Sequence, residues 1–128
     1  MRLLLDTHAF LWFILADPKM SAAALNLITD PANQKQISPA SYWEIAIKIR
    51  LGKYSLPSPY ETFMRQQHLR NNFAILQIAV SHTAVLTTLP LHHRDPFDRL
   101  LVAQAMVEDI PLVSGDPALD AYPIIRLW

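Results

Sequence analysis

Short apolar segments alternate with longer amphipathic segments along this chain, and this alternation constrains the fold more than any other feature of the sequence. The segments expected to form strands are 2–5, 34–37, 73–78, 111–114 and 123–127. The segments expected to form helices are 9–15, 22–29, 39–51, 60–70, 82–88 and one that begins at Pro96. Strands separated by helices imply a parallel sheet that is covered on both faces. We therefore expect an α/β fold with three layers, α/β/α, around a central parallel sheet of about five strands.

Length and composition exclude several classes of protein. The chain has 128 residues, which suits a single domain spanning residues 1–128. It has no cysteine, so disulfides, cysteine-based zinc sites and thiol catalysis are excluded, and its two glycines are too few for a phosphate-binding glycine-rich loop. Lys plus Arg and Asp plus Glu number 11 each, a balance that neither indicates nor excludes a nucleic-acid partner. The longest apolar stretch, 9–16, is too short to span a bilayer, so we expect a cytoplasmic protein with no membrane partner.

The helix that begins at Pro96 carries an unusual acid. Asp95 suits the N-cap position, and Pro96 suits the first helical position, where no backbone N–H is needed. Asp98 falls on the same helical stripe as the apolar residues Leu101, Val102 and Ala105. A carboxylate on a buried stripe needs a partner, and a cation is one candidate. The alternative is a capping box, in which Asp98 bonds back to the N–H of Asp95.

Three more acids are expected at the same edge of the sheet as Asp98. Asp6 follows the first strand, Glu44 lies near the start of the helix after the second, and Asp116 follows the fourth. Open α/β sheets place their ligands at the carboxyl ends of the strands. Taken singly, each acid has another explanation: Asp6 and Asp116 suit helix or turn caps, and Glu44 suits an ion pair with Lys48 on a solvated helix face. Taken together, the four acids favour one site.

The chemistry of such a site would be that of hard divalent cations. Carboxylates crowded together repel one another unless cations hold them, and oxygen ligands select Mg²⁺ or Mn²⁺. Such ions activate water and bind the attacking and leaving oxygens of a phosphodiester. Thr7 and Ser114, each beside an acid, could orient a carboxylate or hold a water, or be hydroxyls satisfied within turns. Arg99 could bind a phosphate or neutralise Asp95 or Asp98.

The adjacent residues His92 and His93 are expected to be loop residues, with RNA contact as the alternative. In an extended loop their side chains point in opposite directions, so the two rings would not chelate one ion together. The neighbouring aromatic residues Tyr42 and Trp43 are expected in the core.

Five segments of the chain together carry a resemblance to a known family. They are 3–8, 41–48, 51–53, 92–101 and 111–116, and they are spread nearly from one end of the chain to the other in the order in which the family has them. The chain resembles the PIN-domain ribonucleases and, among them, the VapC-like toxins of bacterial type II toxin–antitoxin systems.

The resemblance implies a PIN-like α/β/α fold and a Mg²⁺- or Mn²⁺-dependent endoribonuclease that hydrolyses RNA. The acids of the family motif fall on Asp6, Glu44, Asp98 and Asp116, with Asp98 as the catalytic acid and Asp95 as the cap. The resemblance further implies an RNA substrate, a homodimer and a cognate antitoxin whose segment occupies the cleft. If Tyr42 or Trp43 is partly exposed, it would anchor the dimer or the antitoxin.

Two other functions are compatible with an acidic pocket. One is a non-catalytic RNA- or protein-binding module that retains the acidic metal cluster without turnover. The other is a phosphatase that uses Asp6 as a nucleophile, like the haloacid dehalogenases. Those enzymes need a second Asp two residues later, and His8 occupies that position here, which disfavours the phosphatase.

Overall fold

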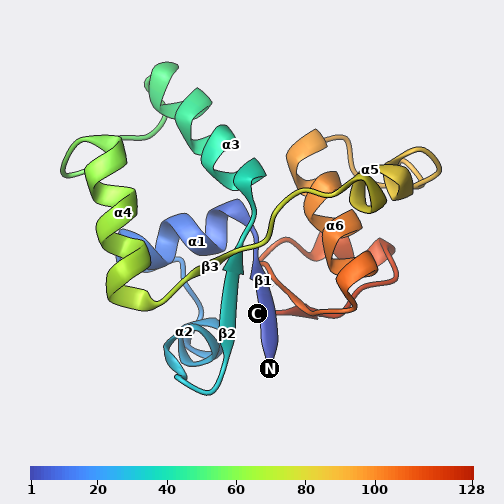
Figure 1. Cartoon of the computed structure of the whole chain (residues 1–128), viewed down its shortest axis with the longest axis horizontal. Coiled ribbons are helices and arrows are strands. Elements are labelled where there is room, and N and C mark those ends of the chain that lie inside the picture. The colour runs from blue at the N-terminus through green and yellow to red at the C-terminus, as the bar shows by residue number, and fades with distance from the viewer.

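A computed structural model describes residues 1–128, in which five parallel strands form one sheet with helices on both sides (Figure 1). The strands are β1 (Arg2–Leu5), β2 (Gln34–Ile37), β3 (Ala74–Ile75), β4 (Leu112–Val113) and β5 (Arg126–Leu127), in the order β3-β2-β1-β4-β5. Every neighbouring pair is parallel, with Leu5 opposite Ile37 of β2 and opposite Val113 of β4. The α/β fold expected from the alternation of strands and helices is confirmed.

Helices cover both faces of this sheet. They are α1 (Thr7–Ile14), α2 (Ala22–Thr29), α3 (Pro39–Arg50), α4 (Tyr60–Asn71), α5 (Val80–Leu86), α6 (Pro96–Glu108) and a 3₁₀ helix, η1 (Pro117–Ala121). Figure 1 shows α1 to α4 on one side of the sheet and α5 and α6 on the other. No helix combines the length and the apolar character needed to cross a membrane.

Strand β1 divides its side chains between two hydrophobic cores. Leu3 and Leu5 belong to the core that β1 shares with α1 to α4, whereas Leu4 belongs to the core that it shares with α6. All three leucines are fully buried. Successive residues of a strand point to opposite faces, and both faces here are covered by helices. The strand therefore reads in the sequence as an unbroken apolar run.

The ends of α3 follow the expected capping chemistry. The Ser38 hydroxyl accepts a hydrogen bond from the N–H of Ala40, and Pro39 occupies the first turn. At the other end Gly52 adopts φ +75°, a left-handed conformation that suits glycine. The N–H of Gly52 donates to Ile49 O, and the next N–H donates to Lys48 O, which together form a Schellman motif.

Several element boundaries differ from the sequence prediction. Helix α1 begins at Thr7 rather than at residue 9, and β4 is Leu112–Val113 rather than 111–114. The strand expected over 73–78 is only Ala74–Ile75, because the chain leaves the sheet after Leu76, whose carbonyl accepts from the buried Gln104 amide at 3.3 Å. Helix α5 begins at Val80 rather than at His82, because His82 Nδ1 accepts the N–H of Ala79 and closes the first turn. The last strand is Arg126–Leu127 rather than 123–127. The 3₁₀ helix η1 was not predicted.

Candidate metal centre

The acids singled out in the sequence are held by elements that begin or end at the carboxyl edge of the sheet. Asp6 directly follows β1, and Asp116 lies shortly after β4. Asp98 is in the first turn of α6, and Glu44 is in the second turn of α3, the helix that follows β2. In Figure 1, β1 runs upward from the end marked N, and α1 and α3 begin beyond the upper ends of β1 and β2.

Asp6 is buried and fixed by the backbone. Its Oδ1 accepts a hydrogen bond from the N–H of Ala9 at 2.7 Å, so it caps α1. Its own N–H donates to Val113 O at 3.0 Å, which ties the residue to β4. Burial raises the pKa of the Asp6 carboxyl, and a hydrogen bond from the Ser114 hydroxyl opposes that rise. Asp6 is therefore a helix cap, which was the alternative to a site residue, and its charge still acts on Asp98.

Asp98, Asp116 and His93 form the tightest group of this site. His93 Nε2 lies 3.0 Å from Asp116 Oδ2 and 3.5 Å from Asp98 Oδ2. One ligand atom from each of the three side chains lies within 4.8 Å of the other two. Burial, with the negative charges of Asp95 and Asp6, raises the pKa of Asp98 to about 7, while His93 opposes the rise. The protein therefore concentrates more negative charge here than its own groups neutralise.

The capping box proposed as the alternative role of Asp98 is not formed. Asp95 is the N-cap of α6, and its Oδ1 accepts from the N–H groups of Phe97 at 2.8 Å and Asp98 at 3.1 Å. The N–H of Asp95 donates to His93 Nδ1 at 3.2 Å and not to the Asp98 carboxylate. The carboxylate of Asp98 is turned instead toward His93 and the charge of Asp6.

Glu44 combines the expected ion pair with an unexpected location. Its Oε2 lies 3.3 Å from the Nζ of Lys48, as the i,i+4 spacing predicted. The prediction of a solvated face is wrong, because Glu44 is only 3% exposed. Its other oxygen, Oε1, is buried without any hydrogen-bond partner. A buried carboxylate oxygen without a donor destabilises the fold. Oε1 therefore needs a partner that the protein itself does not supply.

The two hydroxyls near the acids have different partners. Thr7 Oγ1 donates to Ser41 Oγ at 3.0 Å, a buried contact that joins α1 to α3. Ser114 Oγ accepts the N–H of Asp116 at 3.1 Å, and the Ser114 side chain lowers the pKa of the buried Asp6 carboxyl. Ser114 thus interacts with the backbone of one acid and influences the other, whereas Thr7 is satisfied by the fold.

Arg99 does not pair with an acid. Its guanidinium donates to Leu89 O at 3.1 Å, to Pro90 O at 2.8 Å and to the Tyr122 hydroxyl at 3.2 Å. The expectation that it neutralises Asp95 or Asp98 is therefore wrong. Its side chain is committed to carbonyl groups of the loop that precedes α6, and its role is to hold that loop.

The two adjacent histidines diverge, as expected, but one of them is more than a loop residue. His92 is exposed and packs edge-on against Tyr122, with 5.2 Å between ring centroids. His93 reaches the acids, so the expectation that both are ordinary loop residues is wrong for His93. Its position two residues before the N-cap Asp95 is the one signal in the sequence that could have indicated this.

The donor set fits a hard divalent cation. Carboxylate oxygens predominate, one of them is a buried orphan, and Asp98 resists ionisation among its neighbours. A divalent cation would relieve both conditions, because it supplies the missing partner and the missing positive charge. The assignment of Asp6, Glu44, Asp98 and Asp116 as metal ligands stays a prediction.

Comparison with known families agrees with this architecture. The family model of the PIN domain matches residues 3–125, almost the whole chain. The chain belongs to the PIN domain family. A curated relative, Ribonuclease VapC16 of Mycobacterium tuberculosis, is 35% identical over 71 residues. That match covers 52% of this chain and 50% of the relative, so the chain spans about half the length of the relative that it matches.

Solved structures share the PIN-like fold at low sequence identity. VapBC2 from Rickettsia felis, bound to a DNA fragment from its promoter, matches with a TM-score of 0.73 and 18% identity, covering 99% of this chain and 98% of that one. FitAcB from Neisseria gonorrhoeae matches with a TM-score of 0.65 and 15% identity, covering 98% and 96%. VapBC-1 from nontypeable Haemophilus influenzae matches with a TM-score of 0.60 and 18% identity, covering 99% and 97%. The three-layer fold is therefore that of PIN domains in general.

Proposed function

We propose that this chain is a metal-dependent endoribonuclease that hydrolyses RNA phosphodiester bonds and acts as the toxin of a toxin–antitoxin pair. The observation that carries the proposal is the placement of acids at the carboxyl edge of the sheet, after β1, in α3, in α6 and after β4, where neighbouring acids and burial raise the pKa of Asp98 to about 7. The relative named as a ribonuclease supports the same reaction class.

Each acid has a role in this proposal. Asp6, Asp98 and Asp116 would hold Mg²⁺ or Mn²⁺, and Glu44 would hold the ion or orient the attacking water. When bound, the ion would act as a Lewis acid toward the phosphodiester and increase the acidity of water. Ser114 fixes the backbone of Asp116, and Lys48 pairs with one oxygen of Glu44 while the other stays available.

The decisive experiment offers the purified protein a panel of structured and single-stranded RNAs with Mg²⁺ or Mn²⁺. We expect cleavage that EDTA abolishes. Asp6→Asn and Asp98→Asn should each reduce the rate by about 100-fold or more, since each removes a charge from the site. Asn also serves as an N-cap, so Asp6→Asn preserves the cap of α1, and circular dichroism should show an intact fold.

The same assay separates the nuclease from the alternative of a binding module. Calorimetric titration with Mn²⁺ reports the metal site whether or not RNA is cleaved. A module without turnover would bind Mn²⁺ and yield no metal-dependent product from any RNA. Unchanged cleavage by Asp6→Asn and Asp98→Asn would contradict the proposed mechanism.

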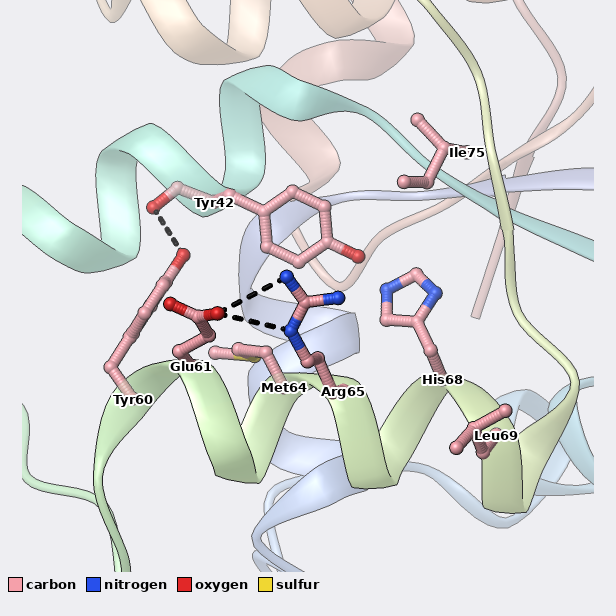
Figure 2. Close-up of a pocket in the computed structure, with 8 residues that line it drawn as sticks. All are labelled: Tyr42, Tyr60, Glu61, Met64, Arg65, His68, Leu69 and Ile75. Carbon is pink, nitrogen blue, oxygen red and sulfur yellow. Dashed lines mark hydrogen bonds and ion pairs between the residues drawn. The ribbon is translucent and has the colours of Figure 1, made fainter.

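We also propose that the chain forms a homodimer and binds a cognate antitoxin. An apolar groove of about 500 Å³ between α3 and α4 supports a protein partner (Figure 2). Tyr42 faces Met64 and His68 across it, and the ion pair between Glu61 and Arg65 lies beside them. Trp43 is 65% exposed and contacts Phe97, with 5.3 Å between ring centroids. The expectation that Trp43 lies in the core is wrong, and its exposure favours a contact with another molecule.

A further inference from the structure

His93 contacts two of the four acids, and the proposed metal site of four acids gives it no role. Its Nε2 lies between the carboxylates of Asp116 and Asp98, at 3.0 and 3.5 Å. The side chain is only 18% exposed, so it does not reach this position as a freely moving surface group. Its role depends on which of its ring nitrogens carries the proton.

The backbone of α6 determines that proton's position. The N–H of Asp95 donates to His93 Nδ1 at 3.2 Å, so Nδ1 is the acceptor. In a neutral imidazole the other nitrogen then carries the hydrogen. Nε2–H is therefore directed at Asp116 Oδ2, with Asp98 Oδ2 close by.

The loop that presents His93 is itself held firmly. The N–H of His93 donates to the Tyr122 hydroxyl at 3.0 Å, and that hydroxyl donates to Pro90 O at 2.8 Å. Arg99 adds two hydrogen bonds to the carbonyls of Leu89 and Pro90. The ring is thus fixed from both sides, by the loop behind it and by the N-terminus of α6.

An N–H group between two carboxylates counteracts their repulsion. Asp116 has one other side-chain hydrogen bond, in which its Oδ1 accepts the N–H of Ala118 at 3.0 Å, whereas the Asp98 carboxylate accepts no hydrogen bond and has His93 Nε2 as its ion-pair contact at 3.5 Å. Carboxylates that bind metals are commonly oriented by such donors, and loss of the donor weakens metal binding. We propose that His93 is a positioning residue that holds Asp98 and Asp116 together for a divalent cation. This inference rests on the proposed function, because it assumes that the acids bind a metal.

Direct ligation by His93 is the competing arrangement. A nitrogen that binds a metal must be free of its proton, so Nε2 could ligate only if the proton moved to Nδ1. That movement would break the hydrogen bond from Asp95. The hydrogen bonds of the ring therefore favour a donor role, and spectroscopy can distinguish the two roles.

The test compares Mn²⁺ affinities, measured by calorimetry at fixed pH without RNA. His93→Leu should weaken Mn²⁺ binding by about 10- to 100-fold, because the donor is lost. His93→Gln keeps an N–H donor of similar reach and should recover most of the affinity. The neighbouring His92→Leu is the matched control and should bind Mn²⁺ as the wild type does, because His92 packs on Tyr122 away from the acids.

Electron spin-echo spectroscopy of the Mn²⁺-bound wild type supplies the second readout. We expect no coupling from a directly bound imidazole nitrogen. Such a coupling, or a His93→Leu protein that binds Mn²⁺ as tightly as the wild type or more tightly, would overturn the inference. If His93→Leu does not fold, the spectrum and the affinity of His93→Gln decide the question. A wild type that binds no Mn²⁺ would overturn the proposed function together with the inference, whereas unchanged binding by His93→Leu overturns the inference alone.

Discussion

Asp98 is the residue at which the fold and the site conflict. Burial and the charges of Asp95, Asp6 and Glu44 all disfavour its ionised form, and only His93 opposes them. The pKa of Asp98 therefore rises from 3.8 to about 7. When the pKa of a carboxyl is higher in the folded than in the unfolded chain, the folded protein loses stability as the pH rises from the unfolded-state pKa to the folded-state pKa. Ionised Asp98 thus destabilises the metal-free protein at and above neutral pH.

Replacing this charge should stabilise the metal-free protein. Asp98→Asn, measured in EDTA by thermal unfolding, should raise the midpoint by about 3–6 °C at pH 8, which corresponds to about 1 kcal/mol. The gain should shrink as the pH falls below 7 and become small near pH 4, where the folded carboxyl is protonated and the pH approaches the unfolded-state pKa of 3.8. A gain of equal size at pH 4 and pH 8 would mean that ionisation is not its cause.

The residues of the site differ in how far the sequence could predict them. Asp98 was noticeable because a charged side chain falls on an apolar helical stripe, and that signal is local. His93 gave only the weak signal of its position before the N-cap Asp95, because its role depends on a loop held by Tyr122, which is distant from it in the sequence. For Glu44 the spacing predicted the pair with Lys48, but burial depends on how α3 packs on the sheet, which spacing does not reveal.

At the scale of the elements, the loop before α6 is held by Arg99 and by the hydroxyl of Tyr122. Tyr122 is 3% exposed, and its hydroxyl bonds with the N–H of His93, the guanidinium of Arg99 and the carbonyl of Pro90. These contacts join the end of η1 to the start of α6 across the carboxyl edge of the sheet. The order of this loop is therefore a property of several elements together.

Removing that hydroxyl should destabilise the protein measurably. Tyr122→Phe leaves the N–H of His93 without a partner, so we expect a loss of about 1–3 kcal/mol in the free energy of unfolding, measured with urea. Tyr54→Phe is a suitable control, because its hydroxyl contacts only the exposed His8, at 3.2 Å. That control should lose less than about 0.5 kcal/mol. Equal losses in the two variants would argue against a special role for Tyr122.

Element types were predictable, and most errors concern the ends of elements. Caps such as Ser38 with Pro39, and the left-handed Gly52, are encoded locally and were confirmed. The short strands were overestimated, since strand length depends on pairing: β3 pairs only at two positions of β2, and β5 only at two of β4. Apolar character alone does not show where a neighbouring strand ends.

At the scale of the whole molecule, one large apolar hollow remains uncovered on the side of the sheet that carries α1 to α4. Its rim includes Leu69, which is 86% exposed, and Ile75, which is 47% exposed and lies on the edge strand β3. Exposed apolar side chains around a groove are typical of a surface that binds a protein. The groove is consistent with the proposed antitoxin partner.

A charged side chain in this groove should prevent binding of the partner without affecting the metal centre. When the chain is co-expressed with its neighbouring genes, we expect a small partner protein to co-purify with the wild type, and Leu69→Asp to abolish or strongly reduce that co-purification. Val80→Asp, at a residue that is 85% exposed on α5 across the sheet, is the matched control and should retain the partner. Both variants should bind Mn²⁺ as the wild type does. Undiminished co-purification of Leu69→Asp would place the partner elsewhere.

The helix caps bear on which ion would suit the proposed metal site. Oδ1 of Asp6 accepts the N–H of Ala9, Oδ1 of Asp116 accepts the N–H of Ala118, and Oδ2 of Asp116 faces His93 Nε2. Bidentate coordination by either carboxylate would compete with these hydrogen bonds. Calcium usually binds six to eight oxygens and often takes a carboxylate in bidentate fashion, whereas magnesium accepts single oxygens and retains water. If these acids bind a metal as proposed, we therefore expect the site to favour magnesium over calcium.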